Sequence, residues 1–458
     1  MNTLGSHRMD ASNTEPGSRD TEAREAHAFA IGLQACMYGL PLVESMRTAS
    51  QMTAVDAPQD TGRAPLNQFG HAARPWTHLD RDVVTPANDL LYSMGWLDLA
   101  AEPIVLTVPP EAKRYWVMAL LDAWTNNFLN IGPRMTQGRA AQFAITTPGW
   151  QGVLPEGVQR VNAPTPLVWI LGRTLVDDAA DLSAARAVQT LFTLTPLSAF
   201  APSNARQPVK PLHYGRYQAS DDPLGFFDNL ARGLAENPPP LADEGLIASF
   251  SGAGIRPGMP VRTDLLDEAT IRGLRRGYQA AMDLIESRTR SRRKGAWGIN
   301  DRLGRFGTDY LARAATAAKG MGGLAADEAL YAMADYDSSR EALHGSRNYV
   351  LHFDAGQLPP CDAFWSVSLY GEDRFFVANP IDRHALGDRS RGLSFNADGS
   401  LDILIQHERP GQRVSNWLPA PAGPFYLILR LYHPRTEALQ AGYRIPPIEC
   451  VSPAQPSA

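Results

Sequence analysis

Short apolar runs bounded by proline and glycine recur in two separate blocks of the chain. In the run from 425 to 432, phenylalanine and leucine occupy every second position, whereas Tyr426, Arg430 and Tyr432 fall on the opposite face. A period of two is typical of β-strands. Similar runs occupy 104–108, 114–124, 167–171, 349–353, 363–370 and 401–406. Successive strands separated by turns predict antiparallel sandwiches or barrels.

Helical spacing appears in two other places. Phe29, Leu33 and Met37 predict a helix that ends or bends at Pro41. The section from 180 to 345 also has helical faces. The expected domains are a disordered tail at 1–20, an N-terminal β domain with its leading helix at 21–215, a helical connecting segment at 216–345 and a C-terminal β-sandwich domain at 346–450.

Composition excludes several classes of protein. The net charge of −5 over 458 residues does not favour a nucleic-acid partner. Cys36, Cys361 and Cys450 cannot build a disulfide framework. The polar N-terminus lacks the apolar core of a secretory signal, and no stretch approaches the roughly 20 apolar residues of a membrane span. We therefore expect a cytoplasmic protein without a membrane partner.

Common catalytic and cofactor motifs are missing from the sequence. There is no G-x-S-x-G elbow, no Walker A loop and no H-E-x-x-H, so no cofactor is predicted. His78, Asp80 and Asp82 would share one face of an extended segment, as ligands of a divalent ion do. A polar loop before a strand is the more frequent explanation, and no metal ligand is predicted.

Two carboxylates of the first block are the predicted catalytic residues. Asp122 interrupts an apolar strand, and a buried carboxylate needs a partner or a shifted pKa. Arg134 and Arg173 are possible partners, so a structural ion pair is the alternative to acid–base catalysis. Asp89 would form the second member of a catalytic pair.

Six further residues are predicted to bind substrate. Asn88 follows Pro86 in a turn-like position and Tyr92 lies nearby, although an Asx-turn and a core aromatic are the alternatives. Arg134 would orient the ligand. In the second block, Arg430 and Tyr432 with Trp365 would form an aromatic wall with a cationic tip; a sandwich core is the alternative.

Several segments resemble a known bacterial family. They are 85–93, 95–99, 114–116, 122–127 and 132–134 in the first block, and 358–360, 363–366, 379–380, 398–400, 416–421 and 429–432 in the second. Together they are similar to domain of unknown function 1254 followed by domain of unknown function 1214, over roughly residues 25 to 450. One departure is Leu90, where the family usually has threonine.

The resemblance implies a fold but no proven reaction. The implied fold is mainly β with helical connections (α+β): two antiparallel β-sandwich or jelly-roll-like domains joined by a helical segment. It also implies homo-oligomers.

Three kinds of function remain open. The first is an enzyme acting on a small polar or carbohydrate-like molecule in a β-domain cleft, in which Asp89 and Asp122 would be the carboxylate pair of glycoside hydrolysis. The second is a carbohydrate-binding module without catalysis. The third is an oligomeric scaffold. A small-molecule or carbohydrate ligand is the expected partner.

Overall fold

The computed structural model describes residues 16–201, 217–290, 297–440 and 442–451. The chain separates into two compact units, each described here by itself. One unit contains residues 1–40 and 218–287, and the other contains 41–217 and 288–458. Of the predicted tail at 1–20, residues 1–15 lie outside the described residues. Helix α1 (Pro16–Met52) begins at the next residue.

The first unit is helical in its described residues. It holds the N-terminal part of α1 with the elements that follow the first sandwich in sequence: α5 (Pro223–Glu236), η2 (Leu241–Asp243), α6 (Glu244–Phe250), η3 (Ser251–Ala253), η4 (Thr263–Leu265) and most of α7 (Glu268–Arg290). The backbones of helices α1 and α7 pack closely at Gly277, because a Cβ added to this residue would lie 2.5 Å from the Phe29 carbonyl oxygen. Inside the unit, the Tyr38 hydroxyl donates a 2.9 Å hydrogen bond to Asp243.

Helix α1 differs from its predicted end. It contains Pro41 and continues to Met52, although proline removes one intrahelical hydrogen bond. Among the described residues, one helical segment, Gly17–Met52, has the length and mean hydropathy (1.3) of a possible membrane span. Its apolar window is 61% buried, and buried core helices share this composition. The cytoplasmic location stays a prediction.

The second unit contains two β-sandwiches. The first sandwich packs a five-stranded sheet, in the order β1-β2-β8-β4-β5, over a four-stranded sheet, β7-β6-β3-β9. The strands are β1 (Gly70–His71), β2 (Leu90–Asp98), β3 (Ile104–Val108), β4 (Trp116–Asp122), β5 (Asn127–Ile131), β6 (Ala141–Thr146), β7 (Val158–Asn162), β8 (Leu167–Leu175) and β9 (Thr193–Pro196). Short helices α2 (Pro133–Thr136), α3 (Leu182–Gln189) and α4 (Leu197–Phe200) connect them. Leu106, Leu120 and Ile170 belong to the core between the sheets.

The second sandwich repeats this design. Sheet β10-β11-β17-β13-β14 packs over sheet β16-β15-β12-β18. The strands are β10 (Gly298–Ile299), β11 (Ala329–Ala334), β12 (Asn348–Phe353), β13 (Cys361–Gly371), β14 (Ala385–Gly387), β15 (Leu401–Gln406), β16 (Trp417–Pro419), β17 (Phe425–Pro434) and β18 (Ile448–Val451). Helix α8 (Tyr310–Lys319), η5 (Val414–Asn416) and α9 (Thr436–Leu439) complete it.

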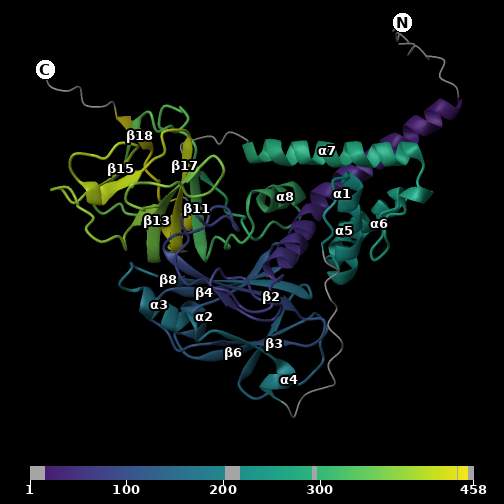
Figure 1. The fold of residues 1–458 in the computed structure, drawn as a ribbon, viewed down its shortest axis with the longest axis horizontal. Coiled ribbons are helices and arrows are strands. Elements are labelled where there is room, and N and C mark those ends of the chain that lie inside the picture. The colour runs from purple at the N-terminus through teal and green to yellow at the C-terminus, as the bar shows by residue number, and fades with distance from the viewer. Residues whose placement is uncertain (1–15, 202–216, 291–296, 441, 452–458) are drawn as a thin grey trace, which may run out of the picture. The chain divides into compact units, whose positions relative to one another are not determined.

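The two five-stranded sheets turn their outer faces toward each other. In β17, Leu427, Leu429 and Leu431 point into the sandwich core, which directs Arg430 to the other face. Arg430 donates to the main chain of Thr85, ahead of β2 in the first sandwich. Figure 1 shows β2, β4 and β8 next to β11, β13 and β17.

The predicted fold class is confirmed: antiparallel pairing dominates, with parallel pairs only between β6 and β7 and between β15 and β16 among the described strands. Helices make up about 29% and strands about 26% of the residues, because α1, α5 and α7 add much helix to the β domains. The predicted domain boundaries stay a prediction.

Candidate functional site

A cavity of about 1260 Å³ lies between the two sandwiches. The first sandwich contributes Tyr92 and Arg173 to its lining, and the second contributes Tyr331, Arg430 and Tyr432. All five residues project from strands β2, β8, β11 and β17, and the loop segments 83–87, 300–303 and 320–323 complete much of the lining.

Arg173 lies near the end of strand β8, on the face that does not enter the sandwich core. It is 5% exposed, and its guanidinium donates to the carbonyl oxygens of Leu171 (3.2 Å) and Gly322 (2.5 Å). Both acceptors are neutral. No carboxylate of the described residues forms an ion pair with it.

Arg430 occupies the equivalent place in the second sandwich. It is 3% exposed and donates to Ser368 Oγ (3.0 Å) and to the Thr85 carbonyl oxygen (2.7 Å). These acceptors are also neutral, and within the described chain no carboxylate comes within ion-pair distance. The cavity wall therefore holds two buried positive charges.

Tyrosine side chains surround both guanidinium groups. Arg173 lies 5.8 Å from the ring centre of Tyr92, and Arg430 lies 5.9 Å from that of Tyr331. Burial raises the pKa of Tyr92, and burial together with the charge of Asp89 raises that of Tyr432. These phenols therefore stay neutral. Tyr92 stacks on Trp76 and Tyr432 stacks on Phe364, so one ring face of each is covered within the protein.

Asp89 lies beside this cluster, just before strand β2. Both of its carboxylate oxygens are buried, and neither forms a hydrogen bond of normal geometry in the described structure. Burial raises the pKa of Asp89, while the nearby Ser366 hydroxyl and the Arg430 charge oppose the shift. Asp89 does not itself line the cavity, but its charge acts on Arg430 and Tyr432, which do.

Asp122 is held in a turn at the end of β4. Its Oδ1 accepts from the backbone N–H groups of Trp124 and Asn126 (2.9 Å each), and its Oδ2 accepts from the Asn126 side chain. Burial raises the pKa of Asp122 to about 6, against these hydrogen bonds. The carboxylate thus has a complete local structural role.

The expected pairing of Asp89 with Asp122 is wrong. Asp122 pairs with Val168, which pairs with Leu97, whereas Asp89 precedes Leu90 at the other end of β2. Eight residue steps of strand separate these levels, or roughly 26 Å. That distance far exceeds the ~10 Å limit for two glycosidase carboxylates. A catalytic role for either residue alone stays a prediction.

Glu328 connects the sandwiches beside the cavity and was missed in the sequence. Its buried carboxylate accepts from Tyr115 (2.9 Å), pairs with Arg134 and contacts His433 Nε2 (3.0 Å). Burial acts to raise the pKa of Glu328, but His433, Arg134 and Tyr115 outweigh it and lower the pKa. Arg134 is thus occupied by an ion pair.

The remaining predicted binding residues have structural contacts. The Asn88 side-chain amide donates to the Trp76 carbonyl (2.6 Å), and Trp76 stacks on Tyr92. Trp365 points into the second sandwich core against Phe353, away from the cavity.

The structure therefore brings together Tyr92, Arg430 and Tyr432 of the predicted binding residues. Their roles stay predictions, as do those of Asn88, Arg134 and Trp365. Arg173 is the addition that sequence could have suggested, since it is the charged residue within the apolar strand 167–175.

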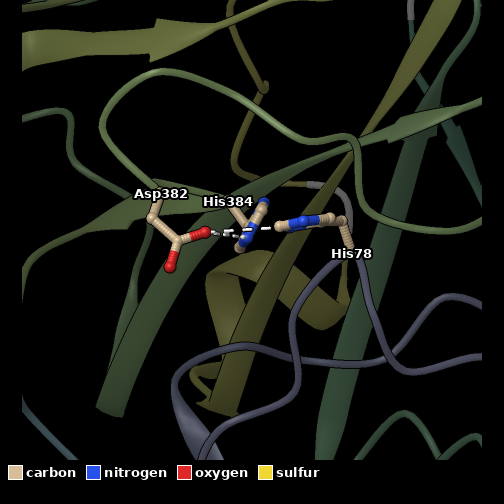
Figure 2. Close-up of side chains that lie close together, drawn as sticks. All are labelled: His78, Asp382 and His384. Carbon is tan, nitrogen blue, oxygen red and sulfur yellow. Dashed lines mark ion pairs between the residues drawn. The ribbon is translucent and has the colours of Figure 1, made fainter.

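The side chains of His78, Asp80 and Asp82 do not meet at one site. Asp80 pairs with Arg74, and Asp82 pairs with Arg63. His78 instead lies with Asp382 and His384 of the second sandwich (Figure 2).

The protein thus belongs to a class with two face-to-face β-sandwiches and, between them, a cavity whose wall contains buried arginine and tyrosine residues. Residues 66–196 match the model described as "Protein of unknown function (DUF1254)", and residues 328–436 match "Protein of unknown function (DUF1214)". The chain belongs to the family that carries these two domains in this order.

One solved structure extends the likeness over nearly the whole chain. The crystal structure of the VPA0106 protein from Vibrio parahaemolyticus is 26% identical, covers 93% of this chain and 100% of its own, and has a TM-score of 0.69. An uncharacterised protein from Burkholderia cenocepacia is 14% identical with a TM-score of 0.45, covering 95% and 97% respectively. No curated protein gives a significant match.

Proposed function

We propose that the chain binds a small organic acid in the cavity between its two sandwiches. The supporting observation is that Arg173 and Arg430 are buried there with neutral acceptors only. Burying a charge without a partner of opposite charge is costly. A carboxylate ligand would offer both guanidinium groups a charged acceptor, which their present hydrogen-bond partners do not.

The chemistry of the wall narrows the ligand further. A guanidinium group binds a carboxylate through two parallel hydrogen bonds, which fixes the ligand's orientation. The ring of Tyr331, which is partly exposed in the cavity lining, offers a flat surface for an aromatic or sugar ring. The preferred ligand is therefore a ring-bearing carboxylic acid, and an acidic sugar belongs to that class.

Asp89 supports a second candidate, an enzyme that moves a proton on such an acid. Its carboxylate is buried, lacks a hydrogen bond of normal geometry and has a raised pKa beside Arg430. These properties are common in groups that donate or accept protons in catalysis. A two-carboxylate glycosidase mechanism gains no support, because Asp122 is remote.

Binding of matched ligands tests the proposal. The full chain is titrated with benzoate and glucuronate, and with benzyl alcohol and glucose as uncharged counterparts, by calorimetry and thermal shift. Saturable binding of an acid together with a raised melting temperature supports the proposal. Equal responses to charged and uncharged members, or none, would contradict it.

Homo-oligomer formation and a scaffold role stay predictions.

A further inference from the structure

A second cluster of polar groups lies outside the cavity lining, where a loop of the first sandwich meets a loop of the second. Asp382 Oδ1 is 3.2 Å from His384 Nε2 and 3.7 Å from His78 Nδ1. One candidate ligand atom from each residue lies within 4.8 Å of the others. Figure 2 shows both imidazole rings directed toward the Asp382 carboxylate.

These spacings match a tetrahedral metal centre. Zinc binds histidine nitrogen and carboxylate oxygen at about 2.0–2.2 Å, which places neighbouring ligand atoms roughly 3.3 Å apart. The observed separations of 3.2 and 3.7 Å lie close to that value. Binding would therefore need only small side-chain movements.

His384 is prepared as a ligand. It is 2% exposed, stacks on Phe376 and has its Nδ1 3.4 Å from the Asn379 side-chain nitrogen. Its Nε2, and Nδ1 of His78, are buried without a hydrogen bond of normal geometry in the described structure.

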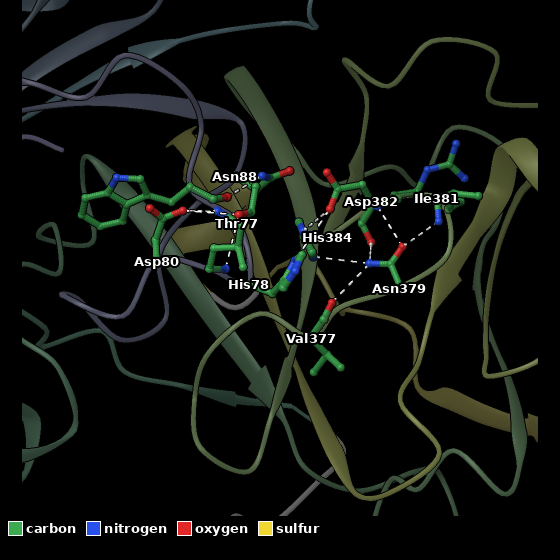
Figure 3. A network of polar contacts seen from close by, with 12 residues as sticks. Thr77, His78, Asp80, Asn88, Val377, Asn379, Ile381, Asp382 and His384 are labelled. Atoms are coloured by element: carbon green, nitrogen blue, oxygen red, sulfur yellow. Dashed lines mark hydrogen bonds and ion pairs between the residues drawn. The ribbon is translucent and has the colours of Figure 1, made fainter. Parts of the chain in front are cut away.

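The surrounding loop fixes the position of Asp382. The Asn379 side chain accepts from the backbone N–H groups of Ile381 (3.3 Å) and Arg383 (3.0 Å), and its amide donates to the Arg383 carbonyl (2.9 Å). Figure 3 shows this network around the cluster. Asp382 itself adopts a left-handed conformation with φ of 52°.

The His78 loop is held from the other side. Asp80 accepts from the Thr77 backbone N–H (2.7 Å), which closes the turn that carries His78. The same carboxylate binds Arg74 through two hydrogen bonds and so offsets the charge of an arginine that interacts electrostatically with Asp382.

We propose that His78, Asp382 and His384 bind one divalent transition-metal ion, with Zn²⁺ the best fit to this ligand set. Two imidazoles and one carboxylate leave a fourth position open, as in zinc sites that bind water or substrate. The Asp382 side chain is 68% exposed, so solvent reaches the cluster. The site joins the two sandwiches and does not depend on the acid-binding cavity.

Metal titration of the tag-free full chain tests this site. With ZnCl₂ alone, calorimetry should give one ion bound per chain, and His78→Ala and Asp382→Asn should each weaken binding at least about tenfold. His352→Ala is the matched control: His352 lies between the carboxylates of Asp354 (3.3 Å) and Asp402 (2.6 Å) but has no second histidine. The control should bind Zn²⁺ as the wild type does.

The substitutions at His78 and Asp382 are at partly exposed positions, so the variants are expected to fold. His78 and Asp382 lie on loops, and circular dichroism with thermal melting in EDTA confirms that each variant is folded. Absence of Zn²⁺ binding by the wild type would overturn the proposal. So would folded His78→Ala and Asp382→Asn variants that retain wild-type affinity, because the ion would then bind elsewhere.

Discussion

Arg430 donates a 2.7 Å hydrogen bond to the main-chain carbonyl of Thr85, and thereby ties the second sandwich to the first. The Thr85 N–H in turn donates to the Arg374 carbonyl (2.9 Å). The peptide of Thr85, at a positive φ of 51°, is therefore held from both sides by the second sandwich. One arginine thus serves both the domain interface and the cavity wall.

Replacement of Glu328 by glutamine should destabilise the interface. The variant loses the charge that pairs with Arg134 and His433 in a site where the Glu328 side chain is 5% exposed. We expect the free energy of unfolding to fall by roughly 2–4 kcal/mol. Asp362→Asn, which removes an exposed pair with Arg435, should cost less than about 1 kcal/mol in the same urea titration. Equal effects would show that Glu328 does not join the sandwiches.

Two groups of the first sandwich, one buried and one half-buried, should give opposite pH dependences. The pKa of Asp122 rises from 3.8 to about 6, so the folded state binds more protons and stability falls as pH rises across that window. Burial lowers the pKa of His71 from 6.5 to about 4, so stability rises with pH over nearly the same range. The wild type should therefore show little net change from these two groups.

Single variants separate the two contributions. In Asp122→Asn, stability should rise between pH 4 and 6 by up to about 3 kcal/mol, the contribution of His71. In His71→Gln, stability should fall by a similar amount over that range. Urea titrations at several pH values provide the slopes. Parallel profiles for both variants and the wild type would contradict the assigned shifts.

The contact of α1 with α7 leaves no room for a side chain at Gly277. Gly277→Ala would place a methyl group 2.5 Å from the Phe29 carbonyl oxygen, and we expect a loss of roughly 1–3 kcal/mol. Gly245→Ala in α6 is the control, since nothing lies within 4 Å of its added Cβ. There the greater helix propensity of alanine should add roughly 0.5–1 kcal/mol. Thermal melts distinguish the two signs, and a stabilising Gly277→Ala would refute the close packing.

Asp89 should weaken the binding of acids as long as it is ionised. Its negative charge acts on Arg430, the group proposed to bind the ligand carboxylate. Asp89→Asn removes this competition, and the affinity for benzoate should rise by up to about tenfold, or 1.4 kcal/mol. Asp388→Asn, a neighbouring aspartate whose carboxylate accepts from the Trp365 N–H, is the comparison. Calorimetry showing weaker binding in Asp89→Asn would argue against a ligand carboxylate at Arg430.

The alternation of side chains made most strands predictable from sequence. Leu427, Leu429 and Leu431 identified the core face of β17, and hence the outward direction of Arg430 and Tyr432. The register between strands was not predictable, because it depends on pairing between segments far apart in the chain. For that reason the sequence suggested a pair of Asp89 and Asp122, although they lie at opposite ends of the sheet along the strand direction.

The proposed metal cluster was also not predictable from sequence, because it depends on contacts between distant parts of the chain. His78 was visible with Asp80 and Asp82, but its neighbours in space, Asp382 and His384, lie about 300 residues later. At Pro41, by contrast, a local signal did not decide the structure. Helix α1 continues through this proline, which normally ends a helix, because the surrounding structure stabilises it. Local patterns therefore predicted the elements, whereas tertiary contacts determined the sites.

Benzoate affinity in arginine variants is the most direct measure of the proposed acid site. Arg173→Gln and Arg430→Gln should each weaken binding at least about 30-fold, because each removes a buried charged contact worth roughly 2–5 kcal/mol. Arg383→Gln, a half-buried arginine that donates to the Val414 and Trp417 carbonyls outside the cavity, should leave the affinity unchanged. Folded Arg173→Gln and Arg430→Gln proteins that bind benzoate as tightly as the wild type would contradict an acid-binding site between the sandwiches.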